Sequence, residues 1–65
     1  MKTYWDYCQD EYPLGSRWRD KGTGTVYTVK SLNIADSLTV IVCFVSEHSA
    51  RYLPASSVNT EMERL

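Results

Sequence analysis

Two runs of β-branched and aromatic residues dominate the hydrophobic pattern of the chain, residues 24–32 and residues 38–45. Such side chains fit the pleated, half-buried surface of a strand better than the surface of a helix. The short polar segment between the runs, residues 33–37, has the composition of a hairpin connection. A two-stranded ribbon is only marginally stable in water, so the rest of the chain must supply further strands. The pattern therefore predicts a small β domain built around this hairpin.

Alternation along the two runs predicts which side chains share a face. In the first run Tyr27 and Val29 lie on one face, because successive residues of a strand point to opposite sides. The second run is apolar on both faces, with one set at Val40, Val42 and Phe44 and the other at Ile41, Cys43 and Val45. A strand of this kind is central and needs cover on its second side. We expect the N-terminal segment to supply that cover; otherwise the second face is an exposed patch that implies a protein partner or self-association.

Shorter elements flank the hairpin. Arg17-Trp18-Arg19 predicts a short strand with Trp18 facing inward and both arginines outward. Residues 46–49 have the composition of a second polar turn, and residues 50–53 that of a fourth strand. Pro54 to Val58 fit one 3₁₀ turn, because proline cannot continue a strand ladder. The tail, residues 59–65, fits either helical or strand spacing, and we favour a short closing strand.

Residues 1–13 hold three acids and four of the eight aromatic residues of the chain, Tyr4, Trp5, Tyr7 and Tyr12. Neither a helical nor an extended arrangement collects these rings on one face. We expect an aromatic arm that packs its rings on the domain or offers them to a partner, with its acids in water. The predicted organisation is an N-terminal arm over residues 1–13 and a β-barrel over residues 14–65.

Length and charge narrow the classes of protein. Sixty-five residues form one domain, and a hydrophobic fraction of 43% excludes disorder as the default. Residues 1–13 carry one lysine and three acids (net −2), residues 14–30 four basic residues and one acid (net +3), and residues 31–65 two arginines and four acids (net −2). A total of −1 gives no global attraction to nucleic acid or to an anionic membrane. With no signal-peptide pattern and no membrane-spanning stretch, we expect a cytoplasmic protein with reduced thiols.

Candidate catalytic and metal-binding residues are few. The one histidine, His48, lies in a polar turn beside Glu47, and triad members normally come together from separate elements. Cys8 and Cys43 are too far apart in the sequence for a redox motif or a zinc-binding pair. No nucleophile stands with both a base and an orienting group. We therefore expect no enzymatic activity, no metal and no cofactor.

Several motifs occur in the order found in SH3-like barrels. Gly15-Ser16-Arg17-Trp18-Arg19 is followed by Gly24-Thr25-Val26-Tyr27-Thr28-Val29, then by a β-branched run and a proline-led ending at residues 53–65. Over residues 13–65 the chain resembles small SH3-like proteins found in phages and prophages. The resemblance implies an all-β, SH3-like barrel of about five strands, with an N-terminal aromatic arm and one 3₁₀ turn before the last strand. Because the tandem tryptophan of true SH3 domains is missing, we do not expect binding of proline-rich peptides.

The resemblance also implies a function. It favours a small non-enzymatic protein-interaction module that binds and modulates a bacterial host protein, or that pairs with a second copy of itself. The predicted partner-binding residues are Tyr4, Trp5, Tyr7, Tyr12, Trp18 and Arg19. The alternative function is weak nucleic-acid binding through a basic face with an interleaved aromatic residue. The residues of that face are Arg17, Arg19, Lys21 and Lys30. No membrane partner is expected.

Overall fold

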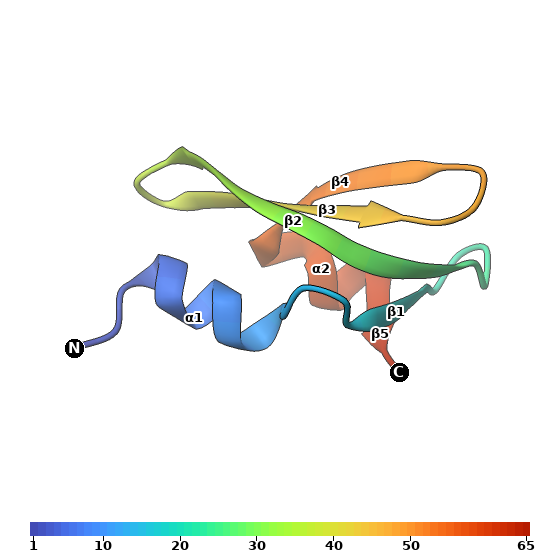
Figure 1. Cartoon of the computed structure of the whole chain (residues 1–65), viewed down its shortest axis with the longest axis horizontal. Coiled ribbons are helices and arrows are strands. Elements are labelled where there is room, and N and C mark those ends of the chain that lie inside the picture. Colours follow the sequence, from blue (N-terminus) through green and yellow to red (C-terminus); the bar gives the residue numbers. More distant parts are fainter.

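The computed structural model describes the whole chain, residues 1–65. Five antiparallel strands and two short helices make up the fold (Figure 1). The elements are α1 (Tyr4–Glu11), β1 (Arg17–Asp20), β2 (Val26–Asp36), β3 (Thr39–Val45), β4 (Ala50–Pro54), α2 (Ala55–Glu61) and β5 (Met62–Arg64). The strands form one sheet in the order β4-β3-β2-β1-β5. The prediction of a small, mostly β fold of five strands is confirmed, and the sheet is open because β4 and β5 do not pair.

The predicted faces of the strands are confirmed for the core. Trp18 of β1 lies opposite Tyr27 of β2, and Val29 of β2 lies opposite Phe44 of β3. All four side chains are buried, whereas Arg17 and the other arginine of β1 are exposed. The strand alternation read from the sequence therefore places these side chains correctly.

Both helices lie on the same side of the sheet, below it in Figure 1. Between helices and sheet lies one core that combines Cys8 of α1 and Val58 of α2 with buried side chains of the strands. Three aromatic rings meet there: Tyr12 lies 5.5 Å from Trp18, and Trp18 lies 6.3 Å from Phe44 between ring centroids. Each large apolar side chain that is fully buried contributes about 1.5–3 kcal/mol. The N-terminal segment is therefore part of the core.

The N-terminal arm is a helix, which the sequence interpretation did not predict. Thr3 caps it: its hydroxyl accepts the N–H of Asp6 at 3.2 Å, and the Asp6 carboxylate accepts the N–H of Thr3 at 3.2 Å. This reciprocal pair satisfies two backbone donors that the start of a helix leaves free. The helical periodicity is weak because Cys8 is the only fully buried residue within α1. Capping and packing of a few residues decide the conformation here.

Two boundaries also differ from expectation. The segment after Pro54 is an α-helix, α2, that continues to Glu61, in place of a single 3₁₀ turn. The closing strand is confirmed but begins only at Met62. The central hairpin is longer than predicted, because β2 continues through the expected connection to Asp36. The Asp36 carboxylate accepts the N–H of Leu38 at 2.9 Å and so closes a tight turn there.

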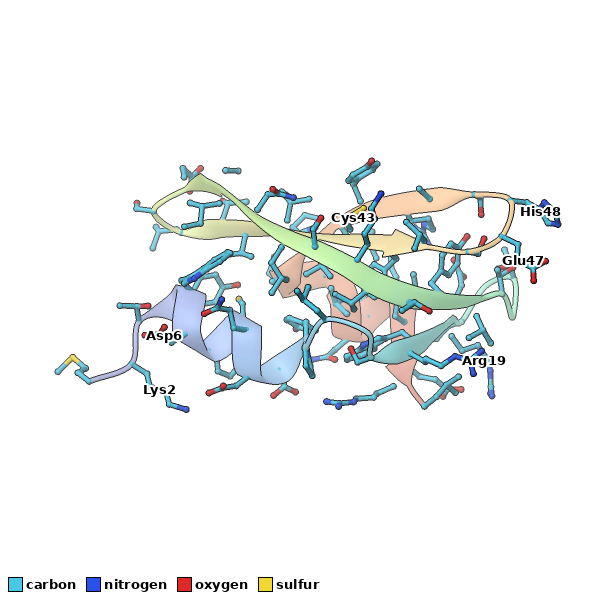
Figure 2. The ribbon with its side chains drawn as sticks, viewed as in Figure 1. Lys2, Asp6, Arg19, Cys43, Glu47 and His48 are labelled. Carbon is cyan, nitrogen blue, oxygen red and sulfur yellow. The ribbon has the colours of Figure 1, made fainter.

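The second face of β3 is not covered by the N-terminal segment, contrary to expectation. Cys8 and Tyr12 pack with Phe44, on the opposite face, and Cys43 is outside that core. Cys43 lies on the side of the sheet away from the helices (Figure 2). Its cross-strand neighbours are Ser31 and Tyr52, and it is only 5% exposed. Neighbouring side chains of the sheet therefore cover Cys43, whereas Tyr52 is 67% exposed.

Candidate functional site

An apolar groove of about 350 Å³ runs between α1 and β2, and we call it the α1–β2 groove. Its wall contains no charged side chain. The lining residues are Trp5, Gln9, Pro13, Leu14, Ser31 and Leu32. Its volume is at the lower end of the range of small-molecule pockets, about 300–1,000 Å³. This groove is the most apolar concave surface of the molecule and our candidate binding site.

The groove follows from how β2 passes the helix. Leu32 lies opposite Val42 and so points to the helix side of the sheet, where it packs against the core beside Trp5. Ile34 lies two residues further along β2 and points to the same side, opposite Val40. Ile34 is 60% exposed, and Leu14, after the helix, is 67% exposed. Apolar surface therefore continues out of the groove onto the surface of the protein.

Sequence reasoning identified only one residue of this groove, Trp5. The sequence pattern predicts that β2 ends at residue 32, so Ile34 falls in the expected hairpin connection. The alternation of Leu32 and Ile34 was the available signal. It gains meaning only once β2 is known to continue to Asp36 with α1 beside it.

The six predicted partner-binding residues are not brought together. Tyr12 and Trp18 are each 2% exposed, so these two predicted contacts are corrected to core residues that no partner reaches. Tyr4 and Tyr7 lie on the exposed side of α1 with their rings stacked at 6.2 Å. Trp5 lies in the α1–β2 groove. The sixth, Arg19, lies at a distance from α1, on β1 (Figure 2), and donates to Glu63 at 2.9 Å.

The predicted basic face is partly neutralised within the chain. Arg19 is paired with Glu63, and the Lys21 ammonium donates to the backbone carbonyl of Asn59 at 2.8 Å. Arg17 and Lys30 are exposed and have no acidic partner. Two free cations support fewer phosphate contacts than four.

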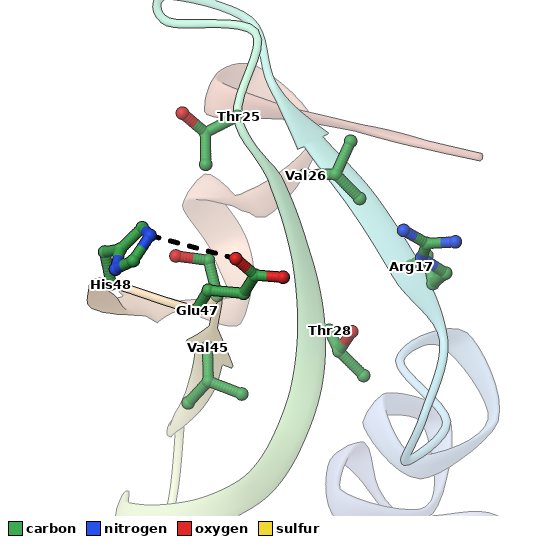
Figure 3. A pocket seen from close by; sticks show the side chains of 8 residues that line it. Arg17, Thr25, Val26, Thr28, Val45, Glu47 and His48 are labelled. Carbon is green, nitrogen blue, oxygen red and sulfur yellow. Dashed lines mark ion pairs between the residues drawn. The ribbon is translucent and has the colours of Figure 1, made fainter.

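A second groove, of about 560 Å³, lies between β1, the start of β2 and the β3–β4 turn (Figure 3). We call it the outer-face groove. It is more polar than the first, with Arg17 at one side and Glu47 and His48 at the other. His48 Nε2 lies 3.8 Å from a carboxylate oxygen of Glu47, and both side chains are almost fully exposed. The remaining lining residues are Thr25, Val26, Thr28, Val45 and Ser46.

The least exposed ion pairs of the chain form a cluster that lies apart from both grooves. Arg51 of β4 bonds both Asp20, at the end of β1, and Glu61, at 2.7 Å, at the end of α2. Asp20 also accepts the backbone N–H groups of Gly22 at 2.8 Å and Thr23 at 3.1 Å. These bonds hold the pKa of Asp20 below its ordinary value, and the bond from the Gly22 N–H has the largest effect. Burial of the carboxylate acts in the opposite direction.

The two thiols lie in different environments. Burial raises the pKa of the Cys8 thiol, although a hydrogen bond with Tyr4 acts in the opposite direction. Cys8 belongs to the core, whereas Cys43 lies on the other face of the sheet, and both are free. No group of three or more His, Cys, Asp or Glu side chains is placed to hold a metal ion. No helix is both long and apolar enough to cross a membrane.

Comparison with known proteins adds no further constraint. No protein-family model, curated protein or solved structure matches the chain. The two grooves and their chemistry are therefore the features of the molecule that bear on function.

Proposed function

We propose that this chain is a non-enzymatic protein-interaction module, of the type of the small phage and prophage proteins that it resembles, and that it binds a bacterial protein. We also propose that the fold is an open variant of the SH3-like barrel. The strand connections support this: β1 to β4 follow one another as neighbours, and β5 returns beside β1. A single helix, α2, stands before the last strand, where SH3-like barrels have a 3₁₀ turn.

The α1–β2 groove carries the functional proposal. Its wall includes the exposed side chain of Leu14, and Ile34, two residues beyond Leu32 on the same face of β2, is also exposed. Burying such surface contributes about 25 cal/mol for each Å² removed from water. A partner that inserts an apolar side chain between Trp5 and Leu32 gains this contribution without rearranging the fold.

Charge indicates the chemistry of the partner segment. The groove itself is neutral, but α1 carries three acids on or near its exposed side: Asp6, Asp10 and Glu11. One cation, Lys2, pairs with Asp10, so the helix keeps a net negative charge. Complementary charges raise the rate and specificity of association. The proposed occupant is therefore an apolar side chain of a partner protein, flanked by lysine or arginine.

The alternative function, weak nucleic-acid binding, is supported less well. Arg19 and Lys21 already bond acceptors within the chain, which leaves Arg17 and Lys30. The binding experiment must still separate the two functions, because exposed cations such as Arg17 and Lys30 attract phosphate groups at low salt.

The test is an affinity pull-down from bacterial lysate with nuclease at low and moderate salt, using the wild-type chain and two matched variants. Leu14→Asp places a charge at the mouth of the groove, and Leu65→Asp changes an equally apolar residue, 54% exposed, that is not part of it. We expect one discrete protein to be retained by wild type and by Leu65→Asp and lost by Leu14→Asp. Equal retention by Leu14→Asp, or recovery of nucleic acid alone, would reject the proposal.

A further inference from the structure

The outer-face groove lies where the sheet loses one of its strands. The pairing of β2 with β3 ends at Thr28 and Val45, and the chain then turns away through residues 46–49. Val26 of β2 therefore has β1 on one side and no strand on the other. Figure 3 shows Val26 and Thr28 of β2 between Arg17 and the turn that carries Glu47.

The backbone of Val26 is directed into this gap. In an antiparallel pair, residues alternate between exchanging hydrogen bonds with the partner strand and pointing away from it. The N–H of Asp20 donates to the carbonyl of Thr25 at 2.8 Å, so Asp20 and Thr25 form a hydrogen-bonded pair. The next pair along the strands, Arg19 and Val26, is therefore a pair that exchanges no hydrogen bonds. The N–H and C=O of Val26 thus point away from β1. No residue of the β3–β4 turn bonds them.

The charges on the two sides of the gap are opposite. Arg17 is exposed and has no acidic partner, whereas Glu47, across β2, has only the nearby His48. Hydroxyl groups of Thr25 and Thr28 and the side chains of Val26 and Val45 also line the groove. A ligand that fits this arrangement carries a negative group toward β1 and a positive group toward the turn.

We propose that the outer-face groove binds a short extended peptide segment that adds to the free edge of β2 at Val26. The peptide backbone bonds the N–H and C=O of Val26, an acidic side chain pairs with Arg17, and a basic side chain pairs with Glu47. Strand addition to an exposed edge takes its affinity from main-chain bonds and its specificity from alternate side chains. This site is independent of the α1–β2 groove, which is on the opposite face of the sheet.

The test uses NMR titration of the labelled protein with synthetic peptides. Each peptide has Thr-Val repeats and blocked ends; one carries a glutamate and a lysine, one only the glutamate, one only the lysine, and one neither. We expect the doubly charged peptide to bind most tightly and to shift the amide signals of Val26 and its neighbours. Arg17→Glu should weaken peptides that carry glutamate by about tenfold, and Glu47→Lys those that carry lysine, because each change replaces attraction with repulsion.

Lys30→Glu is the matched control, since Lys30 is an exposed cation of β2 that does not line the groove. It should leave peptide binding unchanged. The proposal is overturned if the uncharged peptide binds as tightly as the doubly charged one, or if Arg17→Glu has no effect. It is also overturned if oligothymidine shifts the Val26 signals and the peptides do not, which would assign the groove to single-stranded nucleic acid.

Discussion

The guanidinium of Arg51 on β4 donates a hydrogen bond to the carboxylate of Asp20 at the end of β1, joining two strands that are not neighbours in the sheet. A second bond from Arg51 to Glu61, at 2.7 Å, includes the end of α2. Since β4 and β5 do not pair, these bonds are a direct polar link across the open side of the sheet. Arg51 therefore substitutes for part of the strand pairing that a closed barrel would have.

Replacing Arg51 with methionine should lower the thermal stability of the protein by several degrees in Tm. The change leaves the largely buried Asp20 carboxylate without its counter-ion, and an unpaired buried charge is costly. Arg17→Met is the control, because Arg17 is exposed and makes no ion pair. Thermal unfolding followed by circular dichroism measures both. Equal Tm values for the two variants would show that the link contributes nothing.

The stability of the protein should fall in acid through Asp20. Its folded-state pKa lies below the ordinary value of about 3.9, so its contribution is present above about pH 4 and is lost as pH falls through the folded pKa. Asn at position 20 cannot titrate, so Asp20→Asn should be less stable at neutral pH and show a flatter acid dependence. Urea unfolding between about pH 6 and pH 2 measures this.

Asp36→Asn is the comparison for this acid effect. The pKa of Asp36 is also lowered, mainly by the hydrogen bond from the backbone N–H of Leu38 and further by bonds from Thr39. Asp36 therefore contributes separately to the loss of protein stability in acid. A profile of Asp20→Asn that is parallel to wild type would contradict the assignment of the effect to Asp20.

Tyr12→Phe should reduce the free energy of unfolding by about 1 kcal/mol, the usual net contribution of a hydrogen bond. The Tyr12 hydroxyl is buried and donates to the carbonyl of Ala55 at 3.1 Å, which joins the end of α1 to the start of α2. Tyr7→Phe is the matched control, because Tyr7 is 50% exposed and its hydroxyl makes no hydrogen bond. Denaturant unfolding should detect the difference, and equal values for both variants would contradict it.

The raised pKa of Tyr12 leads us to expect that the folded protein loses stability at high pH. Burial raises the pKa of Tyr12 to about 12, with smaller contributions from nearby Tyr7 and Cys8. Its contribution is therefore complete below the ordinary value of about 10 and is lost as pH rises toward the folded pKa. Absorbance titration of the tyrosines should show a group that titrates last and is missing in Tyr12→Phe. A wild-type curve without a late group would contradict the burial of this hydroxyl.

Deleting residues 1–12 should unfold the protein. The deletion removes Cys8 and Tyr12 from the core, and the loss of one large buried aromatic side chain alone costs about 3–5 kcal/mol in a domain whose whole stability is about 5–15 kcal/mol. A deletion of residues 1–2 is the control, because it leaves the Thr3 cap in place. Circular dichroism distinguishes the two outcomes. A folded protein after the longer deletion would show that residues 1–12 are a separable arm.

The sequence alone determined which side chains share a face within the strands that form the core. Alternation is a local property: Trp18 faces away from the two arginines beside it, and Tyr27 shares a face with Val29, because neighbouring residues of a strand face opposite sides. The closing strand was also predicted correctly. The beginning of that strand was not, because Val58 and Met62 satisfy helical and strand spacing equally and only packing separates the two.

The tertiary structure decided everything that depends on which elements meet. The hydrophobic pattern of residues 1–13 has too little periodicity to indicate a helix. Helix α1 forms because Thr3 caps its N-terminus and Cys8 packs into the hydrophobic core. The α1–β2 groove depends on β2 continuing past the predicted turn beside that helix. Asp20 and Arg51 are 31 residues apart in the chain, so no local pattern pairs them. Such contacts depend on the packing energy of the whole fold, and the local pattern of neighbouring residues does not specify it.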